Sequence, residues 1–63
     1  MALKLSLKAL RVNAGFTQAQ IARSLNISPA TLIQWEQGKT KPRADVLIEL
    51  CKIYNCSVDD VRL

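Results

Sequence analysis

The stretch TQAQIARSLNISPATLIQWEQGK, residues 17–39, decides the fold of this 63-residue chain, because it carries the start signals of two helices in succession. Thr17 and Gln20 have the spacing of a capping box, which predicts a helix that begins just after Thr17. Ser28 followed by Pro29 predicts a second start, because a proline at the first helical position gives up no hydrogen bond.

A very short link separates these two predicted helices. The first runs to about Leu25 and the second to about Gln37, where Gly38 ends it. Only Asn26 to Ser28 join the two, and a link this short makes the helices cross steeply, as in a helix-turn-helix. The side chains expected to lock this crossing are Ile21, Ala22, Leu25, Ile27, Leu32 and Trp35.

Three more helical patterns flank this pair. Ser6 can cap a first helix that ends at Gly15, and a fourth pattern runs from about residue 43 or 44 to 54. Ser57, with an acid three residues later, has the capping-box spacing of a brief fifth helix. The expected fold is therefore all-α, a compact five-helix domain that covers residues 1–63.

The segment Leu3–Leu7 permits two interpretations. Its apolar and polar residues alternate, which is typical of a short strand. No other segment alternates in a way that would supply a pairing partner, so we expect an extended lead-in to the first helix.

Charge is distributed unevenly along the chain, whose net charge is +4. Residues 1–43 hold seven Lys and Arg against Glu36 alone, which gives +6, whereas residues 44–63 hold two against four acids, which gives −2. A basic front suggests a surface that faces a polyanion, although charge alone fits a basic protein without such a partner equally well.

The residue types offer little for catalysis, metal binding or membrane insertion. Cys51 and Cys56 fit small buried thiols better than a disulfide scaffold, and without any histidine a zinc site lacks ligands. No Ser or Cys has a plausible base beside it, so we expect no enzyme, no catalytic residue, no cofactor and no small-molecule ligand. The apolar runs are too short for a membrane span and no signal peptide is recognised, which favours a cytoplasmic protein.

Four motifs follow one another over nearly the whole chain. They are Thr17-Gln18-x-x-Ile21-Ala22, Ile27-Ser28-x-x-Thr31-Leu32, Trp35-Glu36-x-Gly38-Lys39 with Pro42, and Leu50-Cys51-x-x-Tyr54-Asn55-Cys56-Ser57-Val58. Together they resemble the phage repressor and Cro-like helix-turn-helix family. The resemblance implies a five-helix domain of a bacterial or phage transcriptional regulator, of repressor type. Such a domain binds double-stranded DNA sequence-specifically, usually as a homodimer on a palindromic operator.

The resemblance also implies roles for single residues. The third helix would enter the major groove with its base-contacting residues Ser28, Pro29, Ala30, Thr31 and Gln34. The implied phosphate contacts are Gln18, Lys39, Thr40, Lys41 and Arg43. Gln18 would also brace the third helix, and Arg11 in the first helix would form a partly buried ion pair with Glu36.

Three points stay open. Ile33 falls off the apolar stripe of its helix, so it faces either the groove or a partner. Pro29 and Ala30 stand where better-known members of the family often carry long polar side chains, so direct base readout would rest on few residues and operator preference could lean on DNA shape. The fold could also serve as a protein-interaction module such as an antitoxin or adaptor, which the basic cluster at residues 39–43 disfavours.

Overall fold

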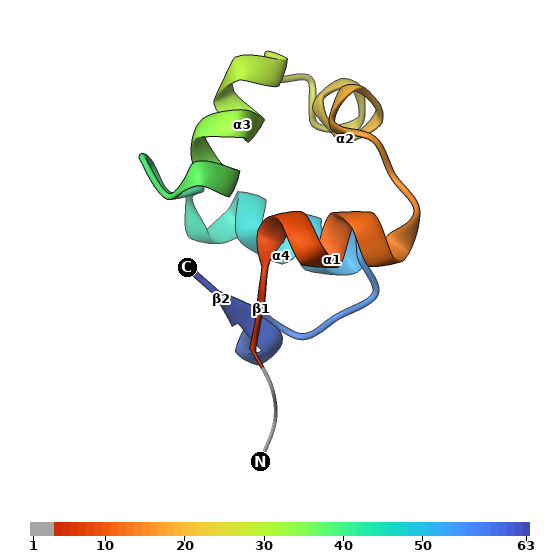
Figure 1. Ribbon diagram of the computed structural model, residues 1–63, viewed down its shortest axis with the longest axis vertical. Coiled ribbons are helices and arrows are strands. Elements are labelled where there is room, and N and C mark those ends of the chain that lie inside the picture. The colour runs from red at the N-terminus through yellow and green to blue at the C-terminus, as the bar shows by residue number, and fades with distance from the viewer. Residues whose placement is uncertain (1–3) are drawn as a thin grey trace.

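Figure 1 shows the computed structural model of the chain, which describes residues 4–63. The elements in order are β1 (Leu5–Ser6), α1 (Leu7–Ala14), α2 (Gln18–Leu25), α3 (Pro29–Gln37), α4 (Ala44–Ile53), the 3-10 turn η1 (Val58–Asp60) and β2 (Val61–Arg62). In the view of Figure 1, α2 and α3 form the upper part, α1 and α4 cross the middle, and the two strands lie below them.

The starts of α1, α2 and α3 are set by side chains that bond the first backbone amides. Thr17 accepts from the backbone N–H of Gln20, whose side chain accepts from the backbone N–H of Thr17, so the predicted capping box is confirmed. Ser28 caps α3 and Pro29 is its first residue, as expected. Ser6 likewise caps α1.

All four α-helices end in the same way. The residues Gly15, Asn26, Gly38 and Asn55 follow them with positive φ angles of 85°, 56°, 77° and 56°. The next amide then reaches back over the helix end, as when Ile27 N donates to Ala22 O at 2.9 Å. This arrangement is the Schellman motif, which satisfies carbonyl groups that the helix itself leaves free. The positions of these glycines and asparagines therefore set where each helix stops.

The core lies where the helices meet. Ile21, Leu32 and Leu50 come from α2, α3 and α4 and are fully buried. Burying a side chain of this size contributes about 1.5–3 kcal/mol, so these residues hold the three helices together. Further residues of the same buried cluster are Leu7, Leu10, Leu47, Cys51, Tyr54 and Val61. Among residues 4–63, no helix is long and apolar enough to cross a membrane.

The described chain is a compact, mostly helical domain as expected, but the prediction of a fifth α-helix is wrong. Ser57 forms the expected capping box with Asp60, but the box caps only the single 3-10 turn of η1. Val58 is 44% exposed, so a longer helix would gain little apolar burial on that side. Val61 is instead buried as part of a strand. Residues 4–63 therefore form four α-helices, a 3-10 turn and a small sheet.

The expectation of an unpaired lead-in is also wrong. Leu5 and Ser6 pair in parallel with Val61 and Arg62, in the register Leu5 to Val61 and Ser6 to Arg62. The partner strand is two residues long, so it is too short to show alternation in the sequence. Leu3, which also belongs to the alternating segment, lies outside the described residues.

Candidate nucleic-acid interface

The unit of α2 and α3 has the predicted crossing geometry. In Figure 1, α2 is seen nearly end-on whereas α3 runs along the plane of the picture, so the two axes cross steeply. Ile21 and Ala22 of α2 and Leu32 of α3 are buried, and the two helices are in contact. Leu25, Ile27 and Trp35 are partly buried and pack against the same core. The packing of these side chains fixes the orientation of α3 and of its exposed face.

The five residues predicted to contact bases lie together over the first turns of α3. Thr31 is half-buried, whereas the other four are exposed. Ser28 Oγ accepts from Thr31 N at 3.3 Å and lies 3.0 Å from Thr31 Oγ1. The Ser28 hydroxyl is thus engaged in capping the helix and in holding Thr31. One turn further along, Gln34 extends the exposed polar surface.

The cationic residues predicted to contact phosphate lie in and just after the loop that follows α3. Lys39, Thr40 and Lys41 are exposed, while Pro42 is buried and anchors the loop to the body of the protein. Arg43 Nε lies 3.5 Å from Asp45 Oδ1, with the two side chains 85% and 69% exposed. An ion pair so open to solvent is weak, so Arg43 can exchange Asp45 for another anion.

Helix α3 carries one acid, Glu36, and no cation, and this acid does not belong to the exposed polar tip. Its side chain is only 3% exposed, and its carboxylate faces inward. Arg11 Nε and Nη2 donate to it at 2.7 and 3.3 Å, and Gln18 Nε2 donates at 2.9 Å. One carboxylate therefore joins α1, the first residue of α2 and α3.

The bond between Gln18 and Glu36 is a contact that sequence reasoning did not specify. Gln18 was expected to contact phosphate and to brace the third helix, but the partner that it braces against was not named. The two residues lie in different helices, and no spacing rule connects them. Only the packed structure shows that the amide reaches the carboxylate.

The arrangement of α2 and α3 is found in a known protein family. The model of the helix-turn-helix family matches residues 7–61, which covers α1 to the first residue of β2. The chain belongs to the helix-turn-helix family.

Three relatives of this helix-turn-helix chain carry the name of an HTH-type transcriptional regulator. The HTH-type transcriptional regulator ImmR of Bacillus subtilis is 39% identical over 59 residues, which cover 94% of this chain and 46% of that protein. DicA of Escherichia coli, an HTH-type transcriptional regulator, is 38% identical over 47 residues, 75% of this chain and 35% of its own length. The uncharacterized HTH-type transcriptional regulator MJ0272 of Methanocaldococcus jannaschii is 29% identical over 59 residues, which cover 94% of this chain and 89% of that protein. The chain therefore spans less than half the length of ImmR and DicA.

Tyr54 belongs to the buried core, and the sequence did not predict that its hydroxyl is buried or that its pKa is raised. Its hydroxyl oxygen is buried and has no hydrogen-bond partner. Burial, and then the nearby charge of Glu36, raise the pKa of Tyr54 to about 12, with Arg11 acting in the opposite direction. The phenol therefore stays protonated beside the ion pair.

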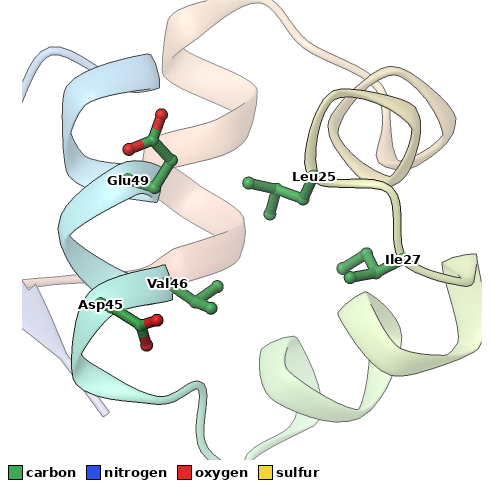
Figure 2. A pocket seen from close by; sticks show the side chains of 5 residues that line it. All are labelled: Leu25, Ile27, Asp45, Val46 and Glu49. Atoms are coloured by element: carbon green, nitrogen blue, oxygen red, sulfur yellow. The ribbon is translucent and has the colours of Figure 1, made fainter.

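A surface pocket of about 330 Å³ opens between α4 and the end of α2 (Figure 2). Leu25, Ile27 and Val46 line it with apolar atoms, and Asp45 and Glu49 line it with carboxylates. None of the residues predicted to contact DNA lies in it, and its acids would repel a phosphate backbone. The pocket is therefore lined by none of the residues predicted to contact DNA, although Leu25 and Ile27 belong to the helix-turn-helix. Within residues 4–63, no group of three potential metal ligands occurs.

Proposed function

We propose that this helix-turn-helix domain binds double-stranded DNA sequence-specifically, as part of a transcriptional regulator of repressor type. The observation that carries the proposal is the juxtaposition of an exposed polar helix tip with exposed cations in the next loop, both attached to one rigid core. ImmR and DicA, which carry the same domain, are named as transcriptional regulators.

In this proposal the first turns of α3 enter the major groove. Gln34 is exposed and carries an amide, which can bond an adenine in two places at once. The exposed Ala30 offers a methyl group that can pack on a thymine methyl. Ser28, Pro29 and Thr31 complete the contacting surface and bring the helix close to the base edges. Ile33, which is half-buried on α3, is left without an assigned role.

The DNA phosphate backbone would be contacted by residues that precede α3 and by residues that follow it in the sequence. Lys39, Thr40, Lys41 and Arg43 provide the contacts that follow it. Gln18 provides one from the first residue of α2, where the free amides of a helix start also favour an anion. These contacts fix the position of the domain on the duplex without reading its sequence.

A homodimer on a palindromic operator completes the proposal. Two copies of α3 would then enter successive major grooves, which lie about 34 Å apart on one face of B-DNA. Sedimentation at micromolar concentration, with and without operator DNA, tests this part. Two chains per duplex are expected, and a strict monomer on a single half-site would refute the dimer.

Binding to a random-sequence duplex at two salt concentrations tests the proposal as a whole. We expect measurable affinity at low salt and a steep fall at high salt, because each phosphate contact releases counterions. Lys41→Ala should make the slope of log K against log salt shallower by about 0.9. Lys52→Ala, which removes an exposed lysine of α4, is the matched control and should leave it unchanged.

Two outcomes would count against DNA binding. One is the absence of binding at low salt, and the other is an affinity that salt does not change. Either result would favour the alternative in which the fold serves as an interaction module, an antitoxin or an adaptor.

A further inference from the structure

The contact between Gln18 and Glu36 bears directly on how the domain would hold DNA. We infer that Glu36 is a positioning residue: its buried carboxylate fixes the amide of Gln18 so that the second N–H is directed to a DNA phosphate. This inference rests on the proposed DNA binding and on the phosphate contact of Gln18.

The chemistry of the two groups sets the direction of the amide. A glutamine amide has two N–H donors on one atom and an acceptor oxygen on the other. An ionised carboxylate only accepts hydrogen bonds, so Glu36 selects the nitrogen side of Gln18, at 2.9 Å. A phosphate also only accepts. The N–H that Glu36 does not use is therefore the group of this side chain that a phosphate can bind, and a reversed amide would present an oxygen to it.

Arg11 makes this arrangement compatible with a nearby phosphate. An unpaired carboxylate behind Gln18 would repel the DNA backbone. Arg11 neutralises it through Nε and Nη2, and both side chains are nearly excluded from solvent. The acid of α3 thus orients a donor without adding net negative charge to the surface.

The arrangement also exists before DNA arrives. A free glutamine side chain loses rotamer freedom when it binds, and this loss weakens the affinity. Gln18 is half-buried and already bonded in the free protein, so much of that ordering is complete. Removing Glu36 should therefore weaken the contribution of Gln18 even though Glu36 itself faces inward.

A double-mutant cycle on DNA affinity tests the inference. Wild type, Gln18→Ala, Glu36→Gln and the double variant are titrated with one duplex that carries the selected operator, at fixed salt and at a temperature where circular dichroism shows all four folded. We expect Gln18→Ala to weaken binding about tenfold, as for one hydrogen bond to a charged group. Gln18→Ala should have a clearly smaller further effect once Glu36→Gln is present, because the amide of that variant can donate as well as accept and no longer selects the nitrogen side of Gln18.

The outcomes separate this inference from the proposed function. If the wild type does not bind, both are refuted. If it binds and the two losses simply multiply, Glu36 does not position Gln18 and only the inference is refuted. Asn13→Ala removes an exposed amide of α1 and is the control that should leave the affinity unchanged.

A second measurement keeps the test decisive if Glu36→Gln does not fold. In ¹⁵N spectra of the wild-type protein, the two side-chain N–H signals of Gln18 report its two hydrogens separately. We expect two distinct signals without DNA, and a large shift of only one of them when the duplex is added. Equal shifts of both signals, or none in either, would overturn the inference.

Discussion

Arg11 and Phe16 are hydrogen-bonded to each other in both directions. Phe16 N donates to Arg11 O at 3.2 Å, and Arg11 Nη1 donates to Phe16 O at 2.9 Å. The other nitrogens of the same guanidinium donate to Glu36. Arg11 thus fixes both the end of α1 and the position of α3, a task for which the planar fork of arginine is suited and a lysine is not.

Replacing this arginine should strongly destabilise the fold. Arg11→Met leaves Glu36 buried without a cation, and breaking one side of a buried pair typically costs about 3–5 kcal/mol. Urea unfolding measures the loss. Arg43→Met breaks the exposed pair with Asp45 and serves as the control, with an expected loss below about 1 kcal/mol. An equally small loss from Arg11→Met would show that the buried pair contributes no more than a surface one.

Removing the hydroxyl of Tyr54 should not weaken the protein. The buried oxygen has no hydrogen-bond partner, and an unsatisfied buried polar group costs about 1–3 kcal/mol. Tyr54→Phe keeps the ring in the core, so the free energy of unfolding should stay equal or rise. Thermal unfolding of both proteins in the same buffer is sufficient. A fall of more than about 1 kcal/mol would mean that the hydroxyl has a partner in solution.

Alkaline pH should destabilise the protein through Cys51. The pKa of Cys51 is raised from 9.0 to about 11, mainly by burial. A hydrogen bond to Cys56, the charge of Cys56 and the charge of Asp60 act in the same direction. The unfolded thiol ionises near pH 9 whereas the folded one stays protonated, so stability is complete below pH 9 and falls as pH rises toward 11.

Urea unfolding across this pH window checks the prediction. Tyr54→Phe is the suitable background, because the pKa of Tyr54 is raised from 10.0 to about 12 and its own effect on stability overlaps this window. In that background, Cys51→Ala should flatten the pH dependence between about pH 9 and 11. Identical curves with and without Cys51 would exclude the thiol as the cause.

Gln34→Ala should relax sequence preference at one base pair of the operator. The loss of an amide that bonds one base is worth about 1–3 kcal/mol of discrimination there, while contacts to phosphate persist. Selection of bound duplexes from a random pool, carried out with wild type and variant, compares the two preferences. An unchanged motif would show that Gln34 does not read a base.

The sequence predicts the helix boundaries well because each depends on a few neighbouring residues. Thr17 and Gln20 bond each other's backbone within one turn, and Asn26 ends the same helix through amides next to it. These interactions form inside the helix end itself. They therefore follow from local sequence, whatever the rest of the chain does.

Contacts between distant segments are the part that the sequence does not predict. Nothing in the spacing of Leu5 and Val61 indicates that they pair. The Ser57 box shows where a turn starts but not how long it continues, so a 3-10 turn and an α-helix look alike.

The contacts of the candidate site also differ in whether the sequence predicts them. The pair of Arg11 and Glu36 follows from the family resemblance rather than from spacing, and its bond to Gln18 becomes visible only in the packed structure. A glutamine at the first position of a helix looks like any polar first-turn residue, which is why its partner could not be named. The base and phosphate contacts stay predictions.

β1 and β2 run parallel, and parallel strands cannot be joined by a tight turn. The crossover between them is the whole helical body, from α1 to η1. Closing so large a loop carries an entropic penalty that a two-residue ladder cannot offset alone. We therefore expect the strands to pair only after the helices have packed, so that the pairing of Leu5 with Val61 would be a late step of folding.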